Sequence, residues 1–237
     1  MAEREVSIDT VTYELEEPFL VLANQNPIEQ EGTYPLTEAE LDRFIARIPI
    51  GYLSREQEVA MLQRVAQFPS LTRTPLAGLD GAGVVALRRF IREHMYVDPA
   101  VAAYAVDLVR ATRPEEPSHA ACLADLFLEG RSPVQVGASP RASLALLHFA
   151  KVAAFLHPPL DQPGRNYVTP ADVAAVAFDV LNHRLILHEL SLYALLGRRP
   201  VPYLNAALRV EGQRVLQRRE ALLQQIVRRI LRGVPLP

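Results

Sequence analysis

The sequence predicts a mostly α-helical protein with a small α/β part at its N-terminal end. Apolar or alternating runs of strand length gather within residues 5–50, whereas helix start signals recur along the chain beyond residue 79. The 237 residues are 49% hydrophobic and 22% charged, a composition typical of globular proteins with a substantial core. Disordered, collagen-like and disulfide-rich classes are therefore excluded.

The N-terminal part is predicted to contain one hairpin and two strands. Residues 5–15 alternate apolar and polar side chains around Asp9-Thr10, a pattern typical of a short β-hairpin. Residues 19–23 read FLVLA, an apolar run that favours a buried parallel strand, and IARIPI at residues 45–50 predicts a second. Polar residues follow the first of these strands directly, where open α/β sheets bind ligands.

Two helices are predicted within this N-terminal part. Thr37 and Glu40 have the spacing of a capping box, which predicts a short helix over residues 37–44. Ser54 caps a second helix that runs to about residue 68.

The remaining chain reads as helices with few interruptions. Asp98-Pro99, Ser139-Pro140 and Thr169-Pro170 each place a capping residue before a proline at the first helical position. Helices are predicted over residues 81–94, 99–112, 140–156, 170–182 and about 205–232. Residues 183–188, HRLILH, predict a small strand. The chain is accordingly divided into residues 1–68, a linker at 69–78, and a helical domain at 79–237.

The sequence has no clear motif for a metal site or for a catalytic nucleophile. The six histidines are scattered without an HExxH pattern, and Cys122 is the only cysteine, so no metal centre is expected. Residues 137–141, GASPR, superficially resemble a nucleophile elbow, but Pro140 follows the serine and Arg141 replaces the final glycine. Ser139 is therefore interpreted as a helix cap.

Three ordered blocks of sequence resemble the MoxR family of AAA+ ATPases. The first is FLVLANQNPIEQEGTYPLTEAELDRF at residues 19–44, followed by GYLSREQEVAML at 51–62. The others are GASPRASLALLHFAKVAAFL at 137–156, then NYVTPADV at 166–173 and LNHRLIL at 181–187. The resemblance implies an incomplete AAA+ α/β core, with a hairpin and two strands, followed by a helical lid. Residues 113–136 and 189–212 then read as local insertions.

The resemblance also implies roles for three residues. Asn26 matches sensor 1, an amide that orients the attacking water, although it could instead cap its loop. Arg43, in LDRF, matches the arginine finger that reaches a neighbouring subunit's nucleotide, with an ion pair to Asp42 or Glu40 as the alternative. Arg141 matches the sensor 2 arginine of the lid. A cation in a first helical turn favours a nearby anion, and a plain surface role is its alternative.

The phosphate-binding motifs of the family are not found in this sequence. The pattern GxxxxGK[ST] of Walker A is absent, the only lysine is Lys151 inside a predicted helix, and no Asp-Glu dipeptide forms a Walker B pair. In the family both motifs lie upstream of the matching region. Met1 therefore resembles an internal methionine, and the chain is expected to be the C-terminal part of a MoxR-type ATPase. The resemblance also implies that, in the AAA+ sheet, the strand that leads into the P-loop lies between the strands at residues 19–23 and 45–50. That strand would be missing here, and each of its two neighbours would have an unpaired edge.

Two functions from different classes follow. The resemblance implies ring-forming AAA+ subunits that use ATP and Mg²⁺ for chaperone-like remodelling, often beside von Willebrand A-domain proteins; this chain alone is expected to be inactive and a poor ATP binder. The alternative is a non-catalytic truncated interaction module that binds intact subunits or other proteins.

The chain is expected in a reducing cytoplasm, because a single cysteine supports no disulfide framework. No membrane insertion is expected, since Lys151 and Pro158-Pro159 limit the weakly charged run at residues 142–160. No nucleic-acid partner is expected either. The acidic N-terminal and arginine-rich C-terminal segments are interpreted as solvated faces or an internal contact.

Overall fold

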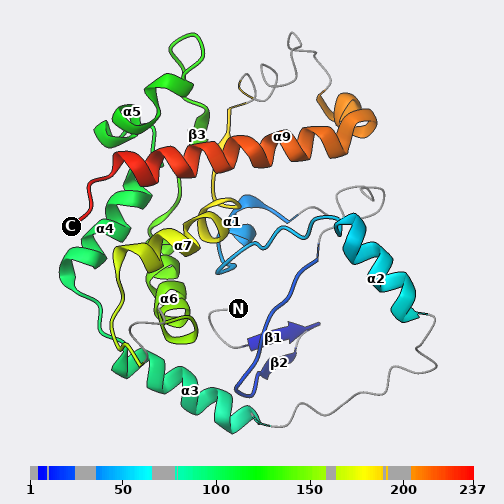
Figure 1. Cartoon of the computed structure of the whole chain (residues 1–237), viewed down its shortest axis with the longest axis vertical. Helices are drawn as coiled ribbons and strands as arrows, with labels where there is room; N and C mark the ends of the chain where they lie inside the picture. The colour runs from blue at the N-terminus through cyan, green and yellow to red at the C-terminus, as the bar shows by residue number, and fades with distance from the viewer. Residues whose placement is uncertain are drawn as a thin grey trace.

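The computed structural model places a bundle of helices beside a small N-terminal part that carries one hairpin (Figure 1). It describes residues 5–9, 11–24, 36–65, 78, 80–158, 164–188, 191 and 204–237. The mostly helical fold class with a small, incomplete α/β part is confirmed. The predicted linker at residues 69–78 lies outside the described residues except for Gly78.

The hairpin predicted over residues 5–15 is present. Strands β1 (Glu5–Ile8) and β2 (Val11–Glu14) pair antiparallel, with Ile8 opposite Val11. Asp9 makes the turn possible with a φ of 55°, in the left-handed region that Asp and Asn tolerate better than most residues. Both strands are exposed along their whole length, so this hairpin contributes little to the core.

The strands predicted over residues 19–23 and 45–50 differ from the structure. Both segments are described, and neither is hydrogen-bonded into a sheet. Their apolar side chains remain in solvent: Leu22 is 84% exposed and Ile50 is 95% exposed. A strand forms only where a neighbouring strand accepts and donates its backbone hydrogen bonds. Among the described residues, no strand pairs with either segment.

The two N-terminal helices begin at the predicted caps. In α1 (Glu38–Leu41), the Thr37 backbone N–H donates to the Glu40 carboxylate at 2.8 Å, and the Glu40 N–H donates to the Thr37 hydroxyl at 3.3 Å. In α2 (Arg55–Val65), the Gln57 N–H donates to the Ser54 hydroxyl at 3.3 Å. Helix α1 is shorter than predicted and ends before Arg43.

The helical domain is built around two adjacent helices, α6 (Pro140–Leu156) and α7 (Pro170–Leu181). Helix α4 (Pro99–Arg110) packs on both, and α3 (Gly81–His94) packs on α6. The long α9 (Leu204–Gly233) contacts α7 and the short α5 (Pro117–Leu123), and it crosses the bundle in Figure 1. The fully buried side chains at the centre of this core include Leu108, Leu146, Val173, Leu181, Leu223, Ile226 and Ile230.

The starts of α4, α6 and α7 agree with the sequence predictions. Asp98 accepts from the Ala100 N–H at 2.8 Å, and Ser139 accepts from the Arg141 N–H at 3.2 Å. The Thr169 N–H and hydroxyl both donate to Asp172, each at 2.7 Å. Pro99, Pro140 and Pro170 stand at the first helical positions. These caps satisfy backbone donors that would otherwise be unpaired at a helix start.

A second small sheet joins the region before α6 to the region after α7. Strand β3 (Val134–Val136) pairs antiparallel with β4 (Ile186–Leu187), with Val134 opposite Leu187. Strand β4 lies inside the predicted strand at residues 183–188. Strand β3, helix α5 and the 3₁₀ helix Ala124–Leu126 were not predicted and lie in the segment read as an insertion.

The buried His119 holds this unpredicted segment in place. Its Nδ1 lies 2.9 Å from the Ala111 carbonyl oxygen, and its Nε2 lies 2.7 Å from the Ser132 hydroxyl. Burial lowers the pKa of His119, which favours a neutral ring. Such a ring donates from Nδ1 and accepts from Ser132 at Nε2. His119 is thus a buried histidine whose two ring nitrogens are both hydrogen-bonded.

Two glycines mark close approaches of the backbone in this domain. A Cβ at Gly137 would lie 2.6 Å from the Thr112 carbonyl oxygen, and a Cβ at Gly233 would lie 2.5 Å from the Cys122 sulfur. Neither space accommodates a larger residue without movement. Gly137 lets the chain pass the end of α4 before Ser139 begins α6, and Gly233 lets α9 end against α5.

Candidate functional site

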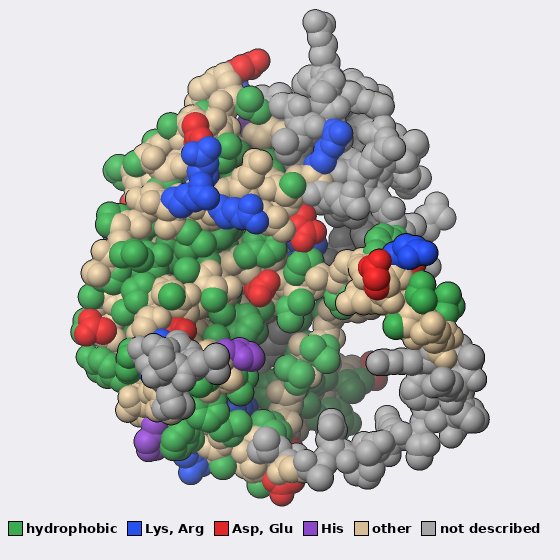
Figure 2. Space-filling view, viewed as in Figure 1, with side chains coloured by type: hydrophobic (Ala, Val, Ile, Leu, Met, Phe, Trp, Pro, Cys, Tyr) green, Lys and Arg blue, Asp and Glu red, His purple; other side chains and the backbone are tan. Residues whose placement is uncertain are grey.

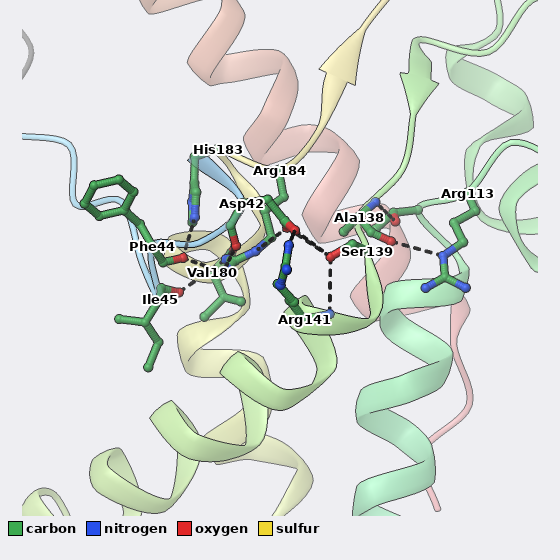
Figure 3. A network of polar contacts seen from close by, with 11 residues as sticks. Asp42, Phe44, Ile45, Arg113, Ala138, Ser139, Arg141, Val180, His183 and Arg184 are labelled. Atoms are coloured by element: carbon green, nitrogen blue, oxygen red, sulfur yellow. Dashed lines mark hydrogen bonds and ion pairs between the residues drawn. The ribbon is translucent and has the colours of Figure 1, made fainter. Parts of the chain in front are cut away.

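The candidate site is centred on the turn that follows α1, residues 42–47, here called the Arg43 turn. The first residues of the turn are hydrogen-bonded to the end of α1. The Arg43 N–H donates to the Glu40 carbonyl at 3.2 Å, and the Phe44 N–H donates to the Leu41 carbonyl at 3.1 Å. The turn lies against the C-terminal end of α7 (Figure 3). Residues far apart in the sequence therefore form one polar cluster.

Three consecutive residues after α7 bind the backbone of the Arg43 turn. The Asn182 amide donates to the Arg47 carbonyl at 2.9 Å, and His183 Nε2 donates to the Phe44 carbonyl at 3.1 Å. Arg184 donates to the Ile45 carbonyl at 3.2 Å and also to the Phe44 carbonyl. These bonds satisfy carbonyl groups of a turn that has no sheet or helix partner of its own.

The backbone of the turn also bonds back to α7. The Arg47 N–H donates to the Asp179 carbonyl oxygen at 2.9 Å, so Arg47 both gives a hydrogen bond to α7 and accepts one from Asn182. Burial raises the pKa of the Asp179 side chain. The Arg43 turn is thus fixed at both of its ends.

Arg184 is the most buried cation of the site. Its side chain is 2% exposed, and its Nε lies 3.2 Å from an Asp42 carboxylate oxygen. The guanidinium also donates to the Val180 carbonyl of α7 and to the Asp42 carbonyl. Burial lowers the pKa of Arg184, and the negative charge of Asp42 opposes that shift. The guanidinium stays charged because arginine titrates far above neutral pH.

Asp42 receives contacts from a second element, the start of α6. The Ser139 hydroxyl lies 3.0 Å and 2.8 Å from the two carboxylate oxygens, and an Arg141 guanidinium nitrogen lies 3.2 Å from one of them. Arg141, from the first turn of α6, and Arg184, from the turn after α7, thus approach one carboxylate from different sides (Figure 3). The hydrogen bonds from the Ser139 hydroxyl and the Arg141 guanidinium have a charged acceptor, and such bonds are stronger than neutral ones.

His183 is neutral in this environment. Burial and the nearby Arg184 charge lower the pKa of His183 to about 4. The neutral ring must carry its proton on Nε2 to donate to the Phe44 carbonyl oxygen. A second proton on the ring would place a further positive charge beside Arg184.

The structure places two of the three predicted site residues. Asn26 lies outside the described residues. Arg43 is exposed, and among the described residues no hydrogen bond or close ion pair joins its guanidinium to Asp42 or Glu40. Hydrogen bonds from Thr37 lower the pKa of Glu40, and the charge of Arg43 still contributes to that shift. Arg141 is 61% exposed, and the anion beside it is Asp42. The structure brings Arg141 to the turn that carries Arg43.

Sequence reasoning missed the residues that build this junction. The sequence indicates Asp42 only as an ion-pair partner for Arg43, and Ser139 only as a helix cap. Asn182, His183 and Arg184 stood inside a recognised block, LNHRLIL, without an assigned role. A run of three polar residues at the end of an apolar helix is a signal for such a docking contact. Its target could not be identified, because Arg184 and Phe44 are 140 positions apart.

The described residues do not form a complete nucleotide or metal site. Arginine guanidiniums such as those of Arg43 and Arg141 suit phosphoryl oxygens, but a triphosphate also requires a backbone cradle and a lysine. The GxxxxGK[ST] motif that supplies both is absent from this sequence. No cluster of three His, Cys, Asp or Glu side chains suited to a metal ion occurs in the part of the chain that is described.

Within the described ranges, every helix is too short or too polar to cross a membrane.

Two segments of the chain match known families, and each of them contributes residues to this site. Residues 1–46, which include all of the Arg43 turn except Arg47, match the ATPase family associated with various cellular activities (AAA). Residues 131–194, which include Ser139, Arg141 and Arg184, match the AAA lid domain. Both halves of the polar cluster thus fall within segments similar to AAA proteins.

Individual proteins agree with these matches. The chain is 40% identical to Chaperone MoxR1 of Mycobacterium tuberculosis, covering 79% of this chain and 45% of that protein. It is 34% identical to the uncharacterized protein YeaC of Bacillus subtilis, covering 90% of this chain and 60% of that one. The chain spans about half the length of the curated relatives it matches.

A solved structure is similar over the whole chain. It is the crystal structure of a candidate ATPase from Cytophaga hutchinsonii, with a TM-score of 0.69 and 33% sequence identity. The match covers 100% of this chain and 59% of that one. This likeness extends over both the N-terminal part and the helical domain.

Proposed function

The chain belongs to the MoxR family of AAA ATPases, and from this premise we propose that it supplies an arginine finger and a lid to a MoxR-type ATPase assembly. Arg43 acts as the finger on a nucleotide held by a neighbouring subunit. Arg141 acts as sensor 2 on the lid, and Asn26 acts as sensor 1. A planar guanidinium that is always charged suits the charge spread over the phosphoryl oxygens in the transition state.

The observation that supports this proposal best is the shared carboxylate of Asp42. Arg141 and Asp42 are 99 positions apart, yet their side chains meet, and Asp42 directly precedes Arg43. A finger must be held in a defined place to act on a neighbour, because misplacement by about 1 Å can reduce a rate by roughly 10²-fold. The contacts of Arg184 and His183 with the Arg43 turn provide such a support.

The chain alone is proposed to have no ATPase activity. Phosphoryl transfer depends on positioning the nucleotide and on Mg²⁺, and the cradle, its lysine and the acidic pair are not encoded in this sequence. ATP and Mg²⁺ are therefore held elsewhere in the assembly. The proposed partners are AAA subunits in a ring and, beyond them, von Willebrand A-domain proteins and client proteins that are remodelled. The proposed compartment is the cytoplasm.

Complementation in trans tests this function. An intact MoxR-type ATPase is prepared with its own finger arginine replaced by alanine, which should abolish turnover. Addition of the 237-residue chain should restore ATP hydrolysis, because Arg43 then completes a neighbouring site. The chain carrying Arg43→Ala should not restore it, whereas Arg89→Ala, at an exposed arginine of α3, should. A wild-type chain that binds the ATPase without restoring turnover would contradict the finger role.

A second candidate function is a non-catalytic interaction module, and exposed apolar side chains favour it. Leu20, Leu22, Ile48 and Ile50 are solvent-exposed in segments that carry no strand pairing. Figure 2 shows further hydrophobic side chains at the surface over α2, where Met61 and Leu62 are exposed. Contiguous exposed apolar surface commonly marks a protein interface. In the same complementation experiment, such a module would bind intact subunits and leave or lower their turnover.

A further inference from the structure

We propose that Asp42 is a positioning residue that couples Arg141 to the Arg43 turn, so that the order of this turn depends on whether Arg141 is paired with Asp42. The meaning of this coupling for ATP hydrolysis rests on the proposed function of Arg43. The coupling itself is a property of this chain and can be measured without any nucleotide.

The first step of the argument is the position of Asp42 in the chain. It is the residue immediately before Arg43, so any displacement of its backbone displaces the next Cα, which is only about 3.8 Å away. The side chain of Asp42 is 17% exposed and lies between the Arg43 turn, the start of α6 and the end of α7. Its contacts therefore act directly on the base of the Arg43 side chain.

The second step is that the two arginines paired with Asp42 differ in how firmly their side chains are held. Arg184 is 2% exposed and is held by backbone carbonyls on both sides, from Val180 and Ile45. Arg141 is 61% exposed and contacts Asp42 through one guanidinium nitrogen at 3.2 Å. Arg184 is thus a fixed partner, whereas Arg141 can leave for another anion with little disturbance of the bundle.

The third step is competition for Arg141. The pairing with Asp42 and a pairing with a phosphate group both use the same guanidinium, so each weakens the other by the same factor. When Arg141 leaves, Asp42 keeps only Arg184 and the Ser139 hydroxyl, and the link between α6 and the Arg43 turn is reduced to Ser139. The turn then loses one of the contacts that hold it between the two helices.

Residue-resolved amide exchange on the 237-residue chain tests this coupling. The reporters are the backbone N–H groups of Arg43 and Phe44, which donate to carbonyls of α1, and of Arg47, which donates to α7. Arg141→Gln should raise their exchange rates about three- to tenfold and should leave the amides of α6 and α7 unchanged. Arg141→Lys should restore most of the protection, because it keeps the charge. Arg89→Gln, at an exposed arginine of α3, is the matched control.

Two further measurements separate coupling from general destabilisation. Salt at about 1 M, where the Debye length is roughly 3 Å, should reproduce the effect of Arg141→Gln in the wild-type chain. In an Asp42→Asn background, Arg141→Gln should have no additional effect on the three reporters, because the shared partner is gone. Equal exchange in the Arg141→Gln and Arg89→Gln chains, or an undiminished effect of Arg141→Gln in the Asp42→Asn background, would overturn the proposal. Neither result would bear on whether Arg43 acts as a finger in the complementation experiment.

Discussion

The Arg184 guanidinium lies 3.2 Å from the Asp42 carboxylate and donates to the Asp42 carbonyl oxygen, although 142 positions separate the two residues. This contact fastens the N-terminal part of the chain to the end of α7. Because Arg184 is buried, its charge requires the opposite charge and the carbonyl oxygens around it. The residue directly before the proposed finger is therefore held by the helical part of the same chain.

Arg184→Gln should destabilise the chain by ~2–4 kcal/mol, because it removes one partner of a buried ion pair and leaves Asp42 with the more exposed Arg141. Arg184→Lys should recover only part of this loss, since an ammonium cannot reproduce the fork that reaches several carbonyls. Urea denaturation followed by circular dichroism measures the change. Arg89→Gln should stay within about 0.5 kcal/mol of the wild type. A similar loss in both glutamine variants would contradict the role assigned to Arg184.

Stability should fall as the pH falls from about 6.5 to about 4. The pKa of His183 is lowered to about 4 in the folded chain, so the unfolded chain binds more protons throughout this window. The lowered pKa of His119 adds to the same trend. His183 makes its full contribution to stability above about pH 6.5, and lowering its pKa from 6.5 to about 4 corresponds to ~3 kcal/mol. Denaturation at a series of pH values should show a shallower slope for His183→Gln, and an unchanged slope would refute this assignment.

Gly137→Ala should cost ~2–3 kcal/mol, because the new methyl group would lie 2.6 Å from the Thr112 carbonyl oxygen and the backbone would have to move. The same movement would strain the hydrogen bond from the Ala138 N–H to the Thr112 hydroxyl, at 2.9 Å. Thermal unfolding reports the loss. Gly51→Ala is the matched control, since a Cβ there meets nothing within 4 Å. If both alanine variants melt like the wild type, the close approach at Gly137 is not restrictive.

Amide exchange should separate the two parts of the chain. Residues 19–23 and 48–50 should exchange fast, because they have no strand partner among the described residues. The buried parts of α6 and α7 should exchange slowly. Within the second predicted strand, residues 45–47 should be intermediate, because the Arg47 N–H is bonded to α7. Strong protection of residues 19–23 in a monomer would show that this segment has found a partner within the chain.

In the complete assembly, Arg43→Ala should lower turnover by roughly 10³- to 10⁵-fold and leave nucleotide affinity nearly intact, because a finger acts on transition-state charge. Steady-state hydrolysis and nucleotide binding by isothermal calorimetry distinguish the two effects. Arg89→Ala serves as the control for a lost surface charge. A loss of affinity as large as the loss of turnover would make Arg43 a ligand of the ground state instead.

Local signals in the sequence were sufficient for most of the helical domain. A capping side chain followed by proline specifies a helix start from residues that are neighbours in sequence, and α4, α6 and α7 begin where Asp98, Ser139 and Thr169 predicted. The hairpin turn at Asp9 is local in the same sense. Such interactions do not depend on how the rest of the chain folds.

Strands and long-range contacts were less predictable for the opposite reason. FLVLA has the composition of a strand, but a strand exists only with a partner, and composition does not say whether one is present. The cluster around Asp42 depends on the meeting of α1, α6 and α7, which follows from packing. Arg43 and Arg141 were singled out by resemblance. Arg184, which joins their neighbourhoods, became apparent only when the segments were seen together (Figure 3).

The end of α9 gives the protein a built-in chemical reporter. Cys122 is its single thiol, it is buried on α5, and Gly233 lies against its sulfur so closely that no side chain fits between them. Burial raises the pKa of Cys122, so little reactive thiolate is present at neutral pH. Alkylation by a maleimide is therefore expected to require that the last turn of α9 separates from α5. The rate of Cys122 labelling thus reports how often this end of α9 separates from α5, without any engineered probe.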